Sequence, residues 1–273
     1  MPARTSAQYA AFAVELTRIH PDPGRIGVAE AATALRQDGR PHDGRPHVAL
    51  NFAATLDGRI TIGGRSGPIG NEVDRELFHE LRAQVDAVMV GAGTAGTERY
   101  GRLVRDPDRR ERRRAAGLDP DPLAVVVTAR LSLDAELPLL QDEHSRVVVI
   151  TEADDEIEGV RATVEYLRPA DAPPSAEELA RRTAMLPLAP FMRVLRERYG
   201  IGTMMCEGGP MLAGALLQEE LVDELFLSLA PKLAAGTGPT VVTSPPLEPP
   251  AGAELVTAHE AGGHLFLRYR IAG

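Results

Sequence analysis

The chain has 273 residues, of which 44% are hydrophobic, and a formal net charge of −9. This length and composition suffice for one large domain or two small ones with a full hydrophobic core. The negative charge argues against a general nucleic-acid-binding surface, because a phosphate backbone would be repelled, whereas a small anion could bind where arginines cluster. The single cysteine, Cys206, excludes an internal disulfide bond and a zinc site built on two thiolates.

The first twenty residues lack the basic leader and unbroken apolar stretch of a secretory signal, since Glu15 and Arg18 interrupt them. No later apolar run is long enough to span a membrane, and a reducing compartment fits the single cysteine. The seven histidines show no ligand spacing. We therefore expect a cytoplasmic protein with no metal and no membrane or nucleic-acid partner.

The N-terminal segment is predicted to be a helical extension followed by a linker. Apolar residues recur at spacings of three and four over residues 6–19, which predicts an amphipathic helix that ends at Pro21. A second short helix is expected over residues 28–37. Residues 38–47, DGRPHDGRPH, have the composition of a linker. This extension, residues 1–46, is expected to precede the main domain.

The main domain, residues 47–273, alternates apolar strands with helical patterns. This alternation implies crossover connections and an α/β fold of three layers around a mainly parallel sheet. Glycines 262 and 263 between two strand-like runs predict that an antiparallel hairpin closes the chain. The expected strands are 48–56, 85–90, 123–128, 146–151, 201–206 and 223–231, and the expected helices are 72–84, one opened by Ser175 and Glu178, 190–199, and one after Gly209.

Three glycines in the spacing G-x-G-x-x-G, GAGTAG at residues 91–96, follow the strand expected at 85–90. A Rossmann unit needs an apolar helix after these glycines and an acidic residue about 20 residues later. Neither is present, because residues 97–122 carry no apolar helical stripe and the next strand ends between Thr128 and Arg130 without an acid. The glycines still suit an anion-binding turn, and Arg130 favours NADPH over NADH because it suits a 2′-phosphate.

A second glycine turn is expected between a strand and a helix. Gly208 and Gly209 follow the strand expected at 201–206, and Pro210 suits the first position of a helix. Two such turns, each at the end of a strand, could hold one dinucleotide from two sides.

Four segments, in this order along the chain, resemble the C-terminal reductase domain of the bifunctional riboflavin-biosynthesis protein RibD. They are NFAATLDGRI, SGPIG, LRAQVDAVMVGAGTAG and CEGGPMLAGALLQEELVDELFLSLAPKLAAG. The resemblance covers residues 48–271 and implies a dihydrofolate-reductase-like fold. It also implies an NADPH-dependent reduction of the ribosylamino sugar of a phosphorylated aminopyrimidine to its ribitylamino product, without flavin or metal. The deaminase half of RibD is absent, since no H-x-E with P-C-x-x-C occurs.

The resemblance assigns substrate contacts to Ser66, Arg82 and Glu207, and Glu207 would act as a catalytic group that fixes sugar hydroxyls. Asn51, in the substrate site, stands where the bifunctional enzymes usually carry lysine, so the chain looks more like the stand-alone archaeal reductases. Asp57 could relay a proton to the departing ring oxygen, although an aspartate before glycine is also typical of a turn. The cofactor-binding residues are expected to be Ala53, Gly91, Gly93, Thr94, Glu98, Thr128, Arg130, Gly208, Gly209, Pro210, Met211 and Leu212.

The stretch 97–105 departs from the family pattern of two aspartates and a proline, followed by a leucine and an arginine that hold the substrate phosphate. Glu98 matches one aspartate, and Arg105 is the best match for the phosphate-binding arginine, with Arg102 as its competitor. Loss of this clamp would favour a reductase acting on a pterin such as dihydrofolate, and the third hypothesis is a nucleotide-binding protein without turnover. The arginine-rich run 109–114 is typical of a solvated loop or short helix.

Simpler structural roles stay open for several of these residues. Ser66 and Thr94 could cap turns, Arg82 could be a solvated surface arginine, and Glu207 could be favoured by a helix dipole. Cys206 is expected to be a small buried apolar residue. The resemblance also implies a homodimer, whose apolar C-terminal strands could pair across a two-fold axis.

Overall fold

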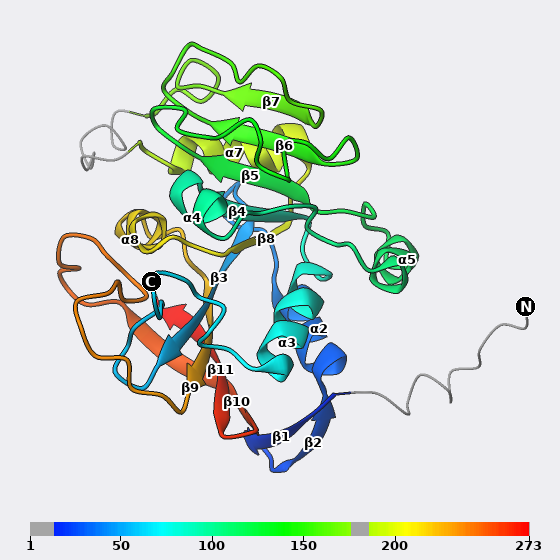
Figure 1. Cartoon of the computed structure of the whole chain (residues 1–273), viewed down its shortest axis with the longest axis vertical. Helices are drawn as coiled ribbons and strands as arrows, with labels where there is room; N and C mark the ends of the chain where they lie inside the picture. Colours follow the sequence, from blue (N-terminus) through cyan, green and yellow to red (C-terminus); the bar gives the residue numbers. More distant parts are fainter. Residues whose placement is uncertain (1–13, 176–185, 273) are drawn as a thin grey trace, which may run out of the picture.

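The computed structural model describes residues 14–175 and 186–272, in which strands and helices alternate along most of the chain (Figure 1). The strands are β1 (Glu15–His20), β2 (Gly24–Gly27), β3 (His47–Thr55), β4 (Ala87–Gly91), β5 (Leu123–Val127), β6 (Arg146–Ile150), β7 (Thr163–Leu167), β8 (Thr203–Cys206), β9 (Glu224–Ala230), β10 (Gly252–Ala261) and β11 (His264–Ala272). The helices are α2 (Val28–Asp38), α3 (Glu72–Arg82), α4 (Ala92–Thr97), α5 (Pro107–Ala115), α7 (Ala189–Tyr199) and α8 (Pro210–Gln218).

All of these strands belong to one open sheet, in the order β2-β1-β10-β11-β9-β3-β8-β4-β5-β6-β7. Neighbours from β9 to β7 pair in parallel. Neighbours from β2 to β9 pair antiparallel, and β10 and β11 form the closing hairpin. The predicted α/β class, mainly parallel with a C-terminal antiparallel hairpin, is confirmed.

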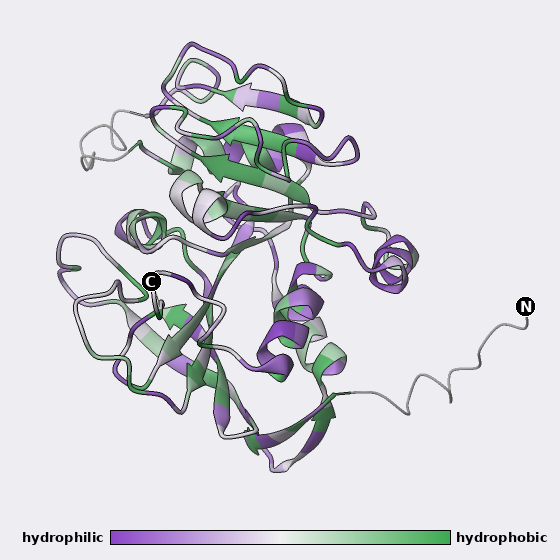
Figure 2. Ribbon diagram, viewed as in Figure 1, coloured by the Kyte–Doolittle hydropathy of each residue, from purple (hydrophilic) through white to green (hydrophobic). Residues whose placement is uncertain are grey.

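The central strands are apolar throughout because helices or loops cover both faces of the sheet, as expected for parallel strands. Along β4, Ala87 and Met89 contribute to one hydrophobic core, while Val88 and Val90 contribute to another. Helices α7 and α8 pack in the first core, and α2 and α3 pack in the second, which gives three layers. Figure 2 shows the hydrophobic colouring concentrated on these central strands.

The predicted helix over residues 6–19 is wrong for its last part, because Glu15–His20 is strand β1. The apolar residues of this segment have helical spacing, but Leu16 is 1% exposed and lies between two exposed residues, which is the alternation of a strand. The segment forms a strand because it pairs with β10. The earlier part of that predicted helix, residues 6–13, lies outside the described residues. Helix α2 confirms the second predicted helix, and the domain division after residue 46 stays a prediction.

Most other predicted elements are confirmed within about two residues, but strand β2 and helix α4 were not predicted. Strand β7 was not predicted, because its TVEYL sequence is only partly buried at the sheet edge. The helix expected after Ser175 lies outside the described residues. Within residues 14–175 and 186–272, no helix has the length and hydrophobicity needed to cross a bilayer.

The arginine-rich run forms helix α5, but Arg113 is not solvated as expected. Its side chain is 1% exposed and donates to the carbonyls of Arg82, Ala83, Val85 and Asp119. Burial lowers the pKa of Arg113 to about 10. The Arg113 guanidinium therefore ties α5 to the end of α3 through hydrogen bonds to backbone carbonyls.

Candidate functional site

A cleft of about 850 Å³ opens where the carboxyl ends of β3, β4 and β8 meet helix α3 and the loops after β3 and α4. This is the edge at which open parallel sheets bind ligands. Twelve of the predicted site residues line it: Asn51, Ala53, Ser66, Arg82, Gly93, Thr94, Glu98, Arg102, Arg105, Glu207, Gly209 and Pro210. The other seven do not: Asp57, Gly91, Thr128, Arg130, Gly208, Met211 and Leu212.

The two predicted glycine turns meet at this cleft because β4 and β8 are neighbouring parallel strands. The Gly91 N–H donates to the Gly208 carbonyl at 2.8 Å. A Cβ atom on Gly209 would lie 2.8 Å from Thr94 Oγ1, which is closer than side chains approach one another. Glycine at position 209 therefore allows the two turns to lie in direct contact.

Helices α4 and α8 start at these turns without a side-chain cap, since their N-cap residues are Gly91 and Gly209. By contrast, Asn71 caps α3 and Asp106 caps α5 through their side chains. The first N–H groups of a helix need acceptors, and an anion is a suitable one. Gly93 is exposed and has open space where a Cβ would project, so a ligand can approach the backbone. Both turns fit the pyrophosphate of a dinucleotide.

The remaining predicted cofactor residues lie around this edge with different exposures. Thr128 is buried and its hydroxyl accepts from the Ser132 N–H at 3.0 Å, whereas Arg130 is exposed in the turn after β5. Met211 is 59% exposed, but Leu212 belongs to the hydrophobic core. The structure therefore leaves Arg130 and Met211 accessible to a ligand and places Leu212 away from one.

Arg82 and Glu207 both line the cleft, where they form a buried ion pair. Arg82 Nε and Nη2 donate to the two carboxylate oxygens of Glu207 at 2.7 and 2.6 Å. Their side chains are 9% and 2% exposed. Tyr100 donates its hydroxyl to the same carboxylate at 2.5 Å, and the Arg82 guanidinium lies over the ring of Phe78. The alternative of a solvated Arg82 is wrong.

The electrostatic environment keeps Arg82 and Tyr100 in the protonated forms that donate hydrogen bonds to Glu207. Burial alone would lower the pKa of Arg82, but the charge of Glu207 outweighs it and the pKa is raised. Burial raises the pKa of Tyr100 well above its usual value, and the Glu207 carboxylate raises it further. The phenol therefore stays protonated and donates at neutral pH. Glu207, expected to bind sugar hydroxyls, already accepts three hydrogen bonds from protein groups.

The structure distinguishes the two candidate phosphate-binding arginines. Arg102 is bound to both carboxylate oxygens of Asp121, with Nη2 2.8 Å from Oδ2. Arg105 is exposed, and its guanidinium lies against Gly101, where a Cβ would collide with it. Among the described residues, no acidic side chain pairs with Arg105. Of these two arginines, Arg105 is therefore the one that is free to bind an anion in the cleft.

Ser66 and Glu98 are brought together at the rim of the cleft. Glu98 Oε1 accepts from the Ser66 backbone N–H at 2.9 Å. This bond joins the loop before α3 to the end of α4 and leaves the Ser66 hydroxyl exposed. The predicted substrate serine and the predicted cofactor glutamate thus form one contact between two loops.

Asp57, the predicted proton relay, lies outside the cleft. Its carboxylate accepts from Thr55 Oγ1 at 2.5 Å and from the N–H groups of Ala234 and Ala235 at 3.0 and 2.7 Å. The hydrogen bond from Thr55, together with those from the two alanines, lowers the pKa of Asp57 to about 2. The structure therefore makes Asp57 an anchor for the loop after β9 and does not place it in the cleft.

This anchor predicts a pH-dependent opening of the loop. Because the folded pKa is depressed from 3.8 to about 2, the stabilisation is present above pH 3.8 and is lost as the pH falls through 2. We expect the Ala234 and Ala235 amides, followed by hydrogen exchange, to lose protection over this window. Asp57→Ala should remove their protection already at pH 6. Equal protection in the variant and the wild type would contradict the anchoring role.

Asp74 and Tyr100 are among the residues that line the cleft but were not predicted as site residues. Asp74 lies one turn before Leu77 and two turns before Leu81, both buried, so its place on the apolar face of α3 was a detectable signal. Tyr100 stands in the stretch that departs from the family pattern, and nothing local indicates that it reaches Glu207.

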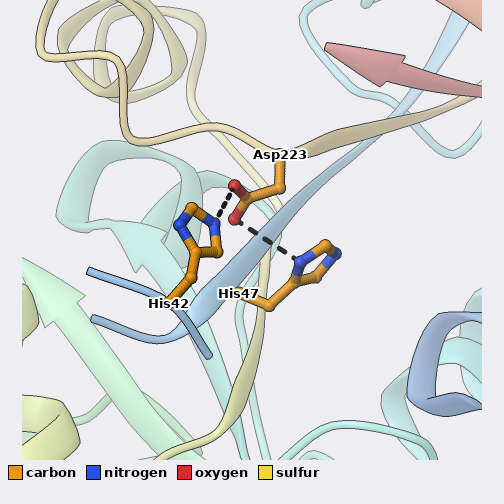
Figure 3. A group of neighbouring side chains, drawn as sticks. All are labelled: His42, His47 and Asp223. Carbon is orange, nitrogen blue, oxygen red and sulfur yellow. Dashed lines mark hydrogen bonds and ion pairs between the residues drawn. The ribbon is translucent and has the colours of Figure 1, made fainter. Parts of the chain in front are cut away.

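The described residues contain one cluster with metal-ligating side chains in reach of one another: His42, His47 and Asp223 (Figure 3). Asp223 accepts from Arg45 at 2.8 and 2.9 Å, from the Val48 N–H at 2.7 Å and from His42 Nε2 at 2.7 Å. Both oxygens are therefore occupied, and the guanidinium would repel a cation. The cluster is a clamp that holds the segment before β3 to the residue before β9.

The sheet, the two uncapped glycine turns and the adjoining cleft define an α/β protein with a candidate ligand site at the carboxyl ends of its parallel strands. The chain belongs to the RibD C-terminal domain family, whose model matches residues 46–261. The predicted resemblance is thereby confirmed.

Known relatives are similar along most of their length. The 2,5-diamino-6-ribosylamino-4(3H)-pyrimidinone 5′-phosphate reductase of Archaeoglobus fulgidus is 34% identical over 199 residues, 72% of this chain and 86% of the relative. The protein of the same name from Methanothermobacter thermautotrophicus is 31% identical over 240 residues, 84% of this chain and all of the relative. The structure of a pyrimidine reductase-like protein from Corynebacterium diphtheriae superposes with a TM-score of 0.68 at 22% identity, covering 89% of this chain and 99% of the other, which supports the fold.

Proposed function

We propose that this protein is an NADPH-dependent reductase of riboflavin biosynthesis that converts the ribosylamino group of a phosphorylated aminopyrimidine to a ribitylamino group. The observation that carries the proposal is that two helices without side-chain caps start at one cleft, beside Arg105, which has no acidic partner among the described residues. The archaeal relatives, whose names specify a pyrimidinone 5′-phosphate, support this substrate class.

The cofactor fits across the two glycine turns. The N–H groups at the starts of α4 and α8 would donate hydrogen bonds to the pyrophosphate, with Thr94 and Pro210 lining the same edge. Arg130, exposed after the neighbouring strand β5, would bind the 2′-phosphate and select NADPH over NADH. When bound, NADPH supplies a hydride for the acceptor carbon.

The substrate would occupy the part of the cleft between β3 and the stretch after α4. Arg105 would hold the phosphate, Ser66 and Asn51 offer polar contacts, and the Arg82–Glu207 pair forms a rigid buried wall. Fixing both reactants in reacting geometry supplies much of the rate in such transfers. The Arg82–Glu207 pair would contribute to the rate by holding the substrate in position, because its two charges are already paired with each other.

The pterin alternative is not favoured. It was motivated by loss of the phosphate clamp, yet Arg105 lines the cleft and is free of an acidic partner among the described residues. The hypothesis of a nucleotide-binding protein without turnover is not favoured either, because it does not explain the polar residues Arg105, Ser66 and Asn51 on the other side of the cleft.

The direct test is oxidation of NADPH by the purified protein, followed by nicotinamide absorbance, with the ribosylaminopyrimidine 5′-phosphate and dihydrofolate offered separately. We expect turnover of the pyrimidine, with a ribityl product two mass units heavier, and weak or no turnover with NADH. Turnover of dihydrofolate alone would replace the proposed substrate, and NADPH binding without turnover of either would favour the non-catalytic hypothesis.

A homodimer in the cytoplasm is part of the proposal. Light scattering of the purified chain tests the oligomeric state, and a measured mass near that of one chain would contradict the proposed dimer.

A further inference from the structure

Four carboxyl groups line the cleft. Within the described part of the chain, three of them accept a direct hydrogen bond from a cation or a backbone amide, which favours the anionic form, and one does not. Glu207 pairs with Arg82, Glu98 accepts a backbone N–H, and Asp106 caps helix α5. The fourth, Asp74, bonds through its carboxyl to the hydroxyl of Ser228. Among these four carboxyls, Asp74 is therefore the one whose anion receives no direct hydrogen bond from a cation or a backbone amide among the described residues.

The backbone around Asp74 holds its carboxyl in place. Its N–H donates to the Asn71 side chain at 2.9 Å in the first turn of α3. Its Oδ2 lies where a Cβ on Gly70 would project, so only glycine at position 70 leaves room for this conformation. Ser228 approaches from β9, beside Ala53 of β3, and both of these residues also line the cleft.

The surroundings of Asp74 favour the protonated form of its carboxyl. Burial raises the pKa of Asp74 from its ordinary value, and this outweighs the hydrogen bond from Ser228. The charged neighbours are Arg75 on the same helix and His264 on β11, both of which act in the opposite direction. A carboxyl with a raised pKa in a cleft is suited to general acid catalysis.

We propose that Asp74 is the general acid that protonates the ring oxygen of the ribosylamino sugar, an inference that rests on the proposed function. It takes the place that the sequence suggested for Asp57, which lies outside the cleft and holds the loop after β9.

The step balances as follows. The bond between C1′ and the ring oxygen breaks, and its electron pair stays on oxygen, which takes the proton of Asp74 and becomes the 4′-hydroxyl. The lone pair of the exocyclic nitrogen forms a C=N bond to C1′, leaving a cationic imine and an ionised Asp74. Reduction of that bond by the NADPH of the proposed function restores a neutral amine, and Asp74 regains a proton from water.

Opening of the sugar ring needs no cofactor, which gives an assay separate from reduction. Because the two anomers of a glycosylamine interconvert through the open imine, exchange between them can be followed by NMR on a substrate labelled with ¹³C at C1′. The wild-type protein without cofactor is expected to accelerate this exchange.

The variants are Asp74→Asn, which keeps size and can still bond Ser228, and Glu72→Gln, a matched control at an exposed acid in the same helix turn. Asp74→Asn should lower kcat about 100-fold or more and abolish accelerated anomer exchange. Its KM and its NADPH affinity, measured by fluorescence, should change little. In the wild type kcat should fall as the pH rises through the pKa of Asp74, and this limb should vanish in Asp74→Asn.

Each result decides between distinct conclusions. Wild-type protein that neither reduces the pyrimidine nor exchanges its anomers would overturn the proposed function and the inference together. Normal wild-type turnover with Asp74→Asn matching Glu72→Gln would overturn the inference alone. A slow Asp74→Asn that keeps the pH limb would reduce Asp74 to a positioning residue. Gly70→Ala, which displaces the carboxyl without removing it, should also lower kcat, and full activity in that variant would contradict the inference.

Discussion

Replacing Glu207 with glutamine is expected to lower the free energy of unfolding by about 3–5 kcal/mol, because it leaves the buried Arg82 guanidinium without its counter-charge. The pair is bidentate, and both side chains are less than 10% exposed. Water cannot replace the lost charge at such a position. Urea denaturation followed by circular dichroism gives the free energy, with an unchanged m-value required for the comparison.

Two further variants separate the ion pair from its surroundings. Tyr100→Phe removes one hydrogen bond to Glu207 while the pair stays intact, and should cost about 1.5 kcal/mol. The double variant Arg82→Met with Glu207→Gln removes both charges and should be more stable than the sum of the two single losses predicts. If the losses simply add, or if Glu207→Gln costs less than Tyr100→Phe, the two side chains are not coupled as described.

The central sheet could be predicted from sequence because strands covered on both faces are continuous apolar runs, as in β4, β5 and β6. Strand β1 could not. Its apolar residues satisfy a helical period, and the choice between helix and strand depends on β10, about 240 residues later in the chain. The secondary-structure propensity of nearby residues carries no information about a partner strand so far away in the sequence.

The same distinction explains the site. The glycine turns were predictable, because tight turns and close backbone approach require glycine locally, and the structure puts Gly209 in contact with Thr94. The pairing of Arg82 with Glu207 joins residues 125 positions apart, and Asp57 is held by a loop 177 positions away. Glu207 and Asp57 were predicted to contact the substrate, and in the structure both carboxylates bind groups of the protein instead.

Replacing Arg105 with alanine is expected to raise the KM for the pyrimidine 5′-phosphate about 10- to 100-fold, with little change in stability. A charge-assisted hydrogen bond to phosphate contributes about 1.5–3 kcal/mol, and each 1.4 kcal/mol is a factor of ten in binding. Arg105 is exposed and has no acidic partner among the described residues, so the folded protein loses little without it. Steady-state kinetics at saturating NADPH measure the change.

Arg102→Ala is the matched control, because it removes the same group from the same stretch of the cleft. Arg102 is held by Asp121 with a side chain that is 19% exposed, so its loss should lower stability and leave the KM nearly unchanged. The dephosphorylated substrate completes the design: its KM should be high with the wild type and insensitive to Arg105→Ala, because the group that Arg105 binds is missing. A KM that rises with Arg102→Ala and not with Arg105→Ala would assign the phosphate to Arg102 and require the Asp121 pair to open on binding.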